Sequence, residues 1–171
     1  GEVIARGENI MVGYHNDPDE TRAVIRDGWL HTGDLAAVDG EGFIYIKGRE
    51  KEFIKSGGYR ISPMQIEEIL LQHTSILECA VVGIAGDEII EERIGAVIVF
   101  REETREDEAG AVEALMAFSR EKMPHYMVPS RFFPVDSIPK TESGKVRRVQ
   151  LREWANGLTS SCATQEGGKV K

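Results

Sequence analysis

The sequence predicts an α+β fold, in which a β-rich segment precedes a small domain with a three-stranded antiparallel sheet and flanking helices. Residues 1–49 contain short apolar runs separated by turn residues, which is typical of strands and hairpins. Apolar residues then recur at helical spacing in 62–72 and 108–123. Two almost uninterrupted apolar runs, 77–84 and 94–100, indicate strands that are buried in a sheet.

The first 49 residues are expected to form short strands, turns and one short helix. Residues 1–5 read as a strand, and a helix over 20–25 follows turn residues and stops at Asp27-Gly28. Residues 35–38 and 43–47 flank a run of Asp, Glu and Gly, so they predict a β-hairpin.

The residues after Gly48 are expected to form the small domain. A short strand over 52–55 leads into glycines, and a helix over 63–72 begins at Pro63 after Ser62. The remaining elements are the two apolar strands, a helix over 108–122, a strand over 131–135 and a helix over 147–154. From about Ala155 the apolar content falls, so residues 155–171 are predicted to be a disordered tail.

Composition narrows the classes of function. The 171 residues carry 21 basic and 29 acidic side chains, a net charge of −8 that disfavours generic binding to nucleic acid. No apolar run approaches the roughly 18–20 residues of a membrane span. The two cysteines form no disulfide framework, which suits a cytoplasmic protein, and no His lies at metal-ligand spacing, so no metal site is predicted. Because the sequence begins at Gly1 within a run of residues typical of a strand, it is expected to be a piece of a longer chain.

The run Thr32-Gly33-Asp34 is the first candidate site. A carboxylate that follows a glycine at a strand can accept hydrogen bonds from two neighbouring hydroxyls, as a ribose presents them. The alternative is an Asp that only stabilises a turn.

The second candidate spans residues 48–60. Arg49 offers a planar guanidinium suited to phosphate or ribose oxygens, and Gly57 and Gly58 allow backbone to approach a ligand. The spacing does not fit a Walker A loop. A glycine-rich hairpin on a charged surface is the alternative.

The third candidate spans residues 139–148. From 138 to 152 the chain holds five basic residues and one acidic residue, a local charge of +4 within an acidic protein. Such a loop favours a specific anion, and Lys145 could place a positive charge at a developing negative centre. The alternative is a solvated basic loop, while nucleic-acid binding lacks interleaved aromatic residues.

Taken in order, these segments resemble the adenylate-forming superfamily of acyl- and aryl-CoA synthetases, luciferases and peptide-synthetase adenylation domains. The matching runs are Gly28-Trp29-Leu30-His31-Thr32-Gly33-Asp34, Gly48-Arg49-Glu50-Lys51-Glu52-Phe53-Ile54-Lys55 and Pro139-Lys140-Thr141-Glu142-Ser143-Gly144-Lys145. The resemblance covers roughly residues 1–154. It implies that residues 1–50 end a large adenylate-forming domain and that 51–154 form a mobile C-terminal lid domain.

Enzymes of this superfamily join a carboxylate to ATP, release pyrophosphate, and pass the acyl group from AMP to a thiol. By resemblance, Asp34 holds the ribose hydroxyls of ATP and AMP, and Arg49 lies near the same ribose and phosphate. Lys51 matches the hinge about which the lid rotates between the two half-reactions. Lys145 matches the catalytic lysine that bridges the carboxylate and the α-phosphate.

The thioester-forming face is implied to include Gly57, Gly58 and Tyr59, which match a loop lining the pantetheine tunnel. Arg60 is expected to reach a phosphate. Rotation about the hinge would present this loop and the catalytic lysine alternately to one adenylate, which keeps water from a labile anhydride.

The resemblance implies ATP, AMP and CoA as substrates, with Mg²⁺ required but liganded outside these residues. The run from 52 to 63 looks like that of CoA ligases, so a fatty-acid (acyl)-CoA ligase is the first hypothesis. The family's phosphate loop, adenine segment and acyl pocket are not in the sequence. The partner is therefore expected to be an N-terminal domain of the same chain, with this piece inactive alone and prone to artefactual self-association. The alternative is a non-catalytic module that binds nucleotide, CoA or a protein.

Overall fold

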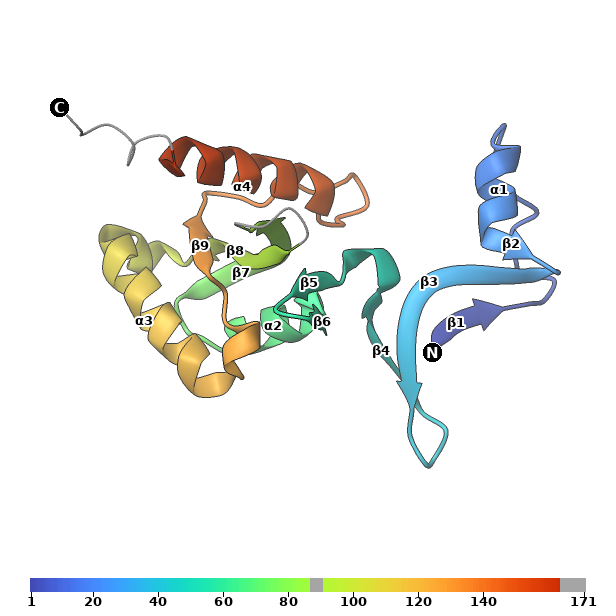
Figure 1. The fold of residues 1–171 in the computed structure, drawn as a ribbon, viewed down its shortest axis with the longest axis horizontal. Helices are drawn as coiled ribbons and strands as arrows, with labels where there is room; N and C mark the ends of the chain where they lie inside the picture. The colour runs from blue at the N-terminus through green and yellow to red at the C-terminus, as the bar shows by residue number, and fades with distance from the viewer. Residues whose placement is uncertain (87–90, 164–171) are drawn as a thin grey trace. The chain divides into compact units, whose positions relative to one another are not determined.

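The computed structural model describes residues 1–86 and 91–163 (Figure 1). The chain forms two compact units, an N-terminal unit of residues 1–52 and a C-terminal unit that begins at Phe53. The candidate residues are distributed over both units, so each unit is described by itself.

The N-terminal unit is built around one long central strand. Its elements are β1 (Glu2–Ala5), α1 (Pro18–Val24), β2 (Ile25–Arg26), β3 (Trp29–Val38), β4 (Ile44–Arg49) and a 3-10 turn, η1 (Glu50–Glu52). Strand β3 pairs antiparallel with each of the other three strands. The predicted hairpin is confirmed, because β3 and β4 flank residues 39–43.

The short helix begins earlier than its predicted start at residue 20. The carboxylate of Asp17 caps the helix by accepting the backbone N–H of Glu20 at 2.9 Å, and Pro18 occupies the first turn. Capping by an Asp and a fixed φ at Pro both favour helix initiation at this point.

Apolar side chains of the β3–β4 hairpin remain exposed in this unit. They are Val38, Phe43, Ile44, Tyr45 and Ile46. Exposed apolar groups gathered on one hairpin are typical of a surface that binds another protein surface. The self-association predicted from the sequence stays a prediction.

The C-terminal unit begins with a small hairpin, β5 (Ile54–Ser56) and β6 (Tyr59–Ile61), followed by α2 (Pro63–Leu70). Its main sheet contains β7 (Ile76–Ala85), β8 (Glu92–Phe100) and β9 (Arg131–Pro134), in that order. Between β8 and β9 lie the 3-10 turn η2 (Glu102–Asp107), α3 (Glu108–Lys122) and the 3-10 turn η3 (His125–Met127), and α4 (Arg148–Ala163) ends the described chain.

The α+β class and the three main strands are confirmed, but the sheet is mixed. Strands β7 and β8 are antiparallel as predicted, whereas β9 runs parallel to β8, with Gly95 opposite Arg131. The reason is the connection: α3 carries the chain back along the sheet, so the next strand enters in the same direction as β8.

Helices cover both faces of this sheet (Figure 1). Alternate residues of β7 separate into two cores: Cys79 and Val81 belong to the core shared with α2 and α3, while Ala80 and Val82 belong to the core shared with α4. This alternation follows from the two-residue period of a strand.

The predicted end of the last helix was wrong. Helix α4 continues to Ala163, nine residues beyond the expected end at Trp154. Ala155 is fully buried against the sheet, and the side-chain oxygen of Asn156 accepts the backbone N–H of Ala85 at 2.7 Å. These contacts hold the end of α4 on the sheet, although residues 155–163 contain few apolar side chains. Residues 164–171 of the predicted tail lie outside the described residues.

Candidate functional site

Asp34 and Arg49 face each other across strands β3 and β4. Arg49 Nε donates a hydrogen bond of 2.9 Å to Asp34 Oδ1, and the two side chains are 59% and 31% exposed. The contact uses one guanidinium nitrogen and one carboxylate oxygen, so the other polar atoms remain at the surface. The pair combines an acceptor for hydroxyl groups with a planar donor for anionic oxygens.

An irregularity in β3 presents Asp34. The register of β1 against β3 shifts between Glu2 and Ile4, and Gly33 has a positive φ of 72°. Glu2 holds this bulge with both carboxylate oxygens, one 2.8 Å from His31 Nδ1 and one accepting the Gly33 N–H at 3.0 Å. The His31 hydrogen bond, and then the Gly33 N–H, hold the pKa of Glu2 below its usual value.

The Thr32 side chain completes the support of Asp34. Its hydroxyl donates to the carbonyl of Val3 at 2.7 Å and accepts the backbone N–H of Asp34 at 3.1 Å. A bulge that redirects one side chain in this way is a common device beside binding sites.

Lys51 lies in the exposed 3-10 turn η1, one residue before the end of the N-terminal unit. The C-terminal unit begins with Phe53 and Ile54, and Ile54 is buried in its core. Lys51 therefore occupies the segment that joins two separately packed bodies.

Gly57 and Gly58 form the two-residue turn of the β5–β6 hairpin. Their φ values are 56° and 78°, and Ser56 pairs with Tyr59 on either side of them. A positive φ at both positions matches the type I′ turn that joins antiparallel strands, and glycine adopts this conformation without steric cost. Residues 54–61 therefore form a β-hairpin with the two glycines at its tip.

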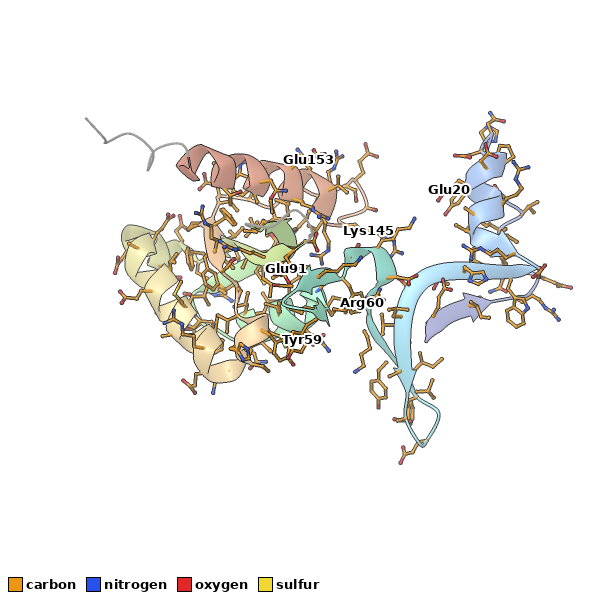
Figure 2. All side chains as sticks on the ribbon, viewed as in Figure 1. Glu20, Tyr59, Arg60, Glu91, Lys145 and Glu153 are labelled. Atoms are coloured by element: carbon orange, nitrogen blue, oxygen red, sulfur yellow. The ribbon has the colours of Figure 1, made fainter. Side chains whose placement is uncertain are left out.

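Tyr59 and Arg60 follow the turn on β6, and Figure 2 labels both. Tyr59 is about half exposed, at 48%, and its ring stacks on Tyr126 of η3. The Arg60 guanidinium lies 5.7 Å from the centre of the Phe53 ring. The turn, Tyr59 and Arg60 together form one exposed edge of the C-terminal unit.

Lys145 ends a tight turn that precedes α4 (Figure 2). The Thr141 N–H donates to the Lys145 carbonyl at 2.8 Å, the Lys145 N–H donates to Thr141 Oγ1 at 3.1 Å, and Gly144 has a φ of 80°. These bonds define the backbone of Lys145. Its side chain is exposed, and within the described residues its ammonium makes no ion pair.

The other basic side chains of residues 138–152 are engaged. Lys140 pairs with Glu78 at 2.5 Å, Arg148 binds both oxygens of Glu67, and Arg152 pairs with Glu92. Arg147 Nε donates to the Lys140 carbonyl at 3.1 Å. Most of the charge of this basic segment therefore serves structural contacts, and Lys145 is the exception.

The predicted site residues are therefore divided between the two units. Asp34 and Arg49 are in contact in the N-terminal unit, with Lys51 close behind in sequence. Lys145 and residues 57–60 belong to the C-terminal unit, on separate loops.

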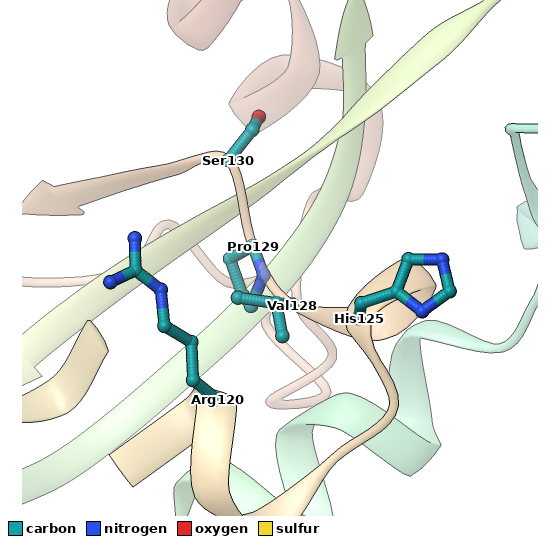
Figure 3. A pocket seen from close by; sticks show the side chains of 5 residues that line it. All are labelled: Arg120, His125, Val128, Pro129 and Ser130. Carbon is teal, nitrogen blue, oxygen red and sulfur yellow. The ribbon is translucent and has the colours of Figure 1, made fainter. Parts of the chain in front are cut away.

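Sequence reasoning missed one pocket in the C-terminal unit. It has a volume of about 420 Å³ and is lined by Arg120, His125, Val128, Pro129 and Ser130. Figure 3 shows the Arg120 and His125 side chains on opposite sides of Val128 and Pro129. Its lining comes from the end of α3, from η3 and from the segment before β9, none of which carries a recognisable motif.

Among residues 1–86 and 91–163, no group of three or more His, Cys, Asp or Glu side chains could hold a metal ion. No helix in that part of the chain is long and apolar enough to cross a membrane.

Comparison with known proteins gives consistent relatives. Residues 65–145 match the family model of the AMP-binding enzyme C-terminal domain. The chain is 42% identical to a long-chain-fatty-acid–CoA ligase of Bacillus subtilis (strain 168), over 90% of this chain and 26% of that protein. It is 43% identical to a sulfoacetate–CoA ligase of Cupriavidus necator, over 91% of this chain and 30% of that protein.

Solved structures agree with these relatives. The o-succinylbenzoate CoA synthetase of Bacillus subtilis, in complex with its acyl-adenylate intermediate, superposes with a TM-score of 0.78 at 34% identity. The match covers 89% of this chain and 30% of that one. The chain therefore spans less than a third of the length of these relatives.

Proposed function

We propose that the chain is the C-terminal part of an AMP-forming CoA ligase, because residues 65–145 match the family model of the AMP-binding enzyme C-terminal domain. The whole enzyme would activate a carboxylic acid with ATP, release pyrophosphate, and transfer the acyl group from AMP to CoA. We further propose that residues 1–50 end its large domain and that 51–154 form its lid, with α4 extending the lid to Ala163.

The state of Lys145 carries this proposal. The other basic side chains of residues 138–152 make ion pairs or hydrogen bonds, whereas the exposed Lys145 ammonium makes neither among the described residues. A positive charge on a well-defined turn can offset the negative charge that grows on the α-phosphate as pyrophosphate leaves. Lys145 is accordingly the residue to which we assign the adenylation step.

Asp34 and Arg49 are proposed to bind the ribose and phosphate of the nucleotide. Their contact at 2.9 Å fixes the orientation of the carboxylate while leaving its second oxygen to accept a hydroxyl. The Thr32 hydroxyl and the bulge at Gly33 support the same carboxylate from behind. The described residues do not fit a metal site, so we assign no step of this chain's chemistry to Mg²⁺.

The lid is proposed to rotate about Lys51 between adenylation and thioester formation. This assignment is supported by the position of Lys51 beside the division between the two units. The hairpin turn at Gly57 and Gly58, with Tyr59 and Arg60, is proposed as the loop that acts in thioester formation with CoA. It lies on a different loop of the unit from Lys145, as two alternately used faces require.

A fatty acid is the first acid to test. Relatives are named for long-chain fatty acid, sulfoacetate and 2-succinylbenzoate, so the family relation leaves the acid open. The choice of a CoA ligase rests on the resemblance of residues 52–63 to CoA ligases, and the panel of acids identifies the acid.

The decisive experiment is ATP–pyrophosphate exchange by the full-length protein with a panel of carboxylic acids. Lys145→Ala should lower exchange by roughly two orders of magnitude or more, the usual scale for removing an electrostatic stabiliser. Lys122→Ala, which removes an exposed lysine of α3, should leave exchange unchanged. Equal exchange in wild type and Lys145→Ala would reject the assignment and favour a non-catalytic binding module. The 171-residue chain alone should show no turnover.

A further inference from the structure

We propose that the Arg148–Glu67 ion pair is a positioning element that holds the Lys145 turn on the sheet, so that adenylation depends on it. The inference rests on the proposed role of Lys145. It concerns Glu67 of α2 and Arg148 of α4, neither of which has a role in the proposed chemistry.

The pair is a fork-to-fork contact inside the C-terminal unit. Arg148 Nη1 donates to Glu67 Oε1 at 2.6 Å, and Nη2 donates to Oε2 at 3.0 Å. Strand β7 closes the arrangement, because the Val81 carbonyl accepts from Arg148 Nη1 at 3.0 Å while the Val81 N–H donates to Glu67 Oε1 at 2.7 Å. One contact therefore joins α2, β7 and the first residue of α4.

This contact is well shielded compared with others in the chain. The side chains of Arg148 and Glu67 are 21% and 13% exposed, against 42% and 32% for the Lys140–Glu78 pair. Bidentate charge-assisted hydrogen bonds are stronger and more directional than single contacts. Loss of Arg148 would also leave the Glu67 carboxylate partly buried without its bidentate partner, which is unfavourable.

Arg148 lies three residues after Lys145, at the base of the turn. The Arg148 N–H donates to the Val146 carbonyl at 3.1 Å, and the Arg147 N–H donates to the Pro139 carbonyl at 2.9 Å, so the two legs of the turn are tied together. None of residues 139–147 is buried. Val146, at the base of the turn, packs against the core shared with α4. The position of Lys145 therefore depends on this contact and on the polar anchors at the ends of the turn.

The packing of α2 and α4 depends less on the Arg148–Glu67 pair than the position of the Lys145 turn does. Helix α2 is held by Ile66 and Leu70, which are fully buried, and α4 by Leu151 and Ala155. What the pair adds is a fixed starting point for α4, and hence for the turn that carries Lys145. A catalytic charge must be held to within about 0.5 Å to be effective, so this anchor should matter for rate.

The test compares two adjacent glutamates of α2 in the full-length protein. Glu67→Gln removes the charge from the pair, and Glu68→Gln makes the same change at an exposed neighbour. ATP–pyrophosphate exchange and thioester formation from supplied acyl-adenylate are measured for each. Glu67→Gln should lower kcat for exchange about tenfold or more while thioester formation stays within about twofold. Glu68→Gln should change neither.

Equal loss in both half-reactions would mean a general structural role and would overturn the proposal. Combining Glu67→Gln with Lys145→Ala gives a second check, because a residue that acts through Lys145 should cause little further loss once Lys145 is removed. Additive losses would also overturn it. If Glu67→Gln does not fold, Arg148→Lys takes its place, since lysine keeps the charge but not the fork, and the same selective loss is expected.

Amide hydrogen exchange separates failure of this inference from failure of the proposed function. Glu67→Gln should speed exchange in residues 139–147 while β7 and β8 stay protected. Unchanged protection of the turn would reject the anchor even if Lys145 is catalytic. A faster turn together with full activity of Lys145→Ala would instead reject the role of Lys145, and with it the dependence of adenylation on the pair.

Discussion

The rings of Tyr59 and Tyr126 stack face to face, with centroids 4.2 Å apart and an interplanar angle of 11°. Tyr59 follows the turn of the β5–β6 hairpin, and Tyr126 lies in η3, 67 positions later in the chain. His125, next to Tyr126, lines the pocket of about 420 Å³. The stack therefore attaches the proposed thioester-forming loop to the segment that forms one wall of that pocket.

Removing the stack should affect thioester formation selectively. An aromatic pair contributes about 0.5–1.5 kcal/mol beyond its area, so Tyr126→Ala should slow acyl transfer to CoA roughly three- to tenfold through a less ordered hairpin. Tyr126→Phe keeps the ring and should behave as wild type. Single-turnover transfer from supplied acyl-adenylate measures the effect, and an equal loss of pyrophosphate exchange would contradict it.

The Asp34–Arg49 pair should matter for nucleotide binding far more than for stability. Exposed ion pairs contribute only about 0–1 kcal/mol to folding. Asp34→Ala should therefore leave the thermal midpoint of the full-length protein within a few degrees of wild type while weakening ATP binding about tenfold or more, the usual scale for lost charge-assisted hydrogen bonds. Calorimetric titration with ATP measures the affinity. Unchanged affinity would mean that Asp34 only stabilises the bulge.

Substitutions at Gly57 should report the backbone conformation of the hairpin turn. The left-handed region costs a residue with a Cβ about 1–2 kcal/mol, and Asn is among the residues that tolerate it. A Cβ at Gly57 would meet only Tyr59 Cδ2, at 3.9 Å, so the expected cost is conformational and not steric. In urea unfolding, Gly57→Ala should destabilise the chain by about 1 kcal/mol and Gly57→Asn by less. Equal losses would point to side-chain size as the cause.

Protonation of Glu2 at low pH should weaken the hydrogen bonds that hold the bulge before Asp34. The pKa of Glu2 is lowered by the His31 hydrogen bond and then by the Gly33 N–H. A carboxyl group with a lowered folded-state pKa contributes stability above its usual value of 4.5, and this contribution is lost as the pH falls through the folded-state pKa. The stability difference between wild type and Glu2→Gln should therefore be largest above pH 4.5 and shrink at lower pH. A difference that stays constant through acid would show that the charge of Glu2 is irrelevant.

Local patterns were sufficient for most of the fold. Residues 77–84 form an almost uninterrupted apolar run, which is a property of consecutive residues, so the sequence alone predicted a buried strand there. Helix α3 was predicted with its observed ends, Glu108 and Lys122, because its start, dipole charges and following proline are all local signals. The three polar segments were found in the same way, from residues adjacent in the chain.

Tertiary structure decided what depends on distant residues. Arg148 finds Glu67 81 positions away and Arg152 finds Glu92 60 positions away, so no local pattern could separate these engaged arginines from the exposed Lys145. The parallel entry of β9 and the extension of α4 to Ala163 likewise depend on packing against the sheet. Sequence by itself determined which residues carry charge and which segments form most of the strands and helices, because those are short-range properties. Only the folded chain determined which charges are neutralised, because that depends on partners brought together through the fold.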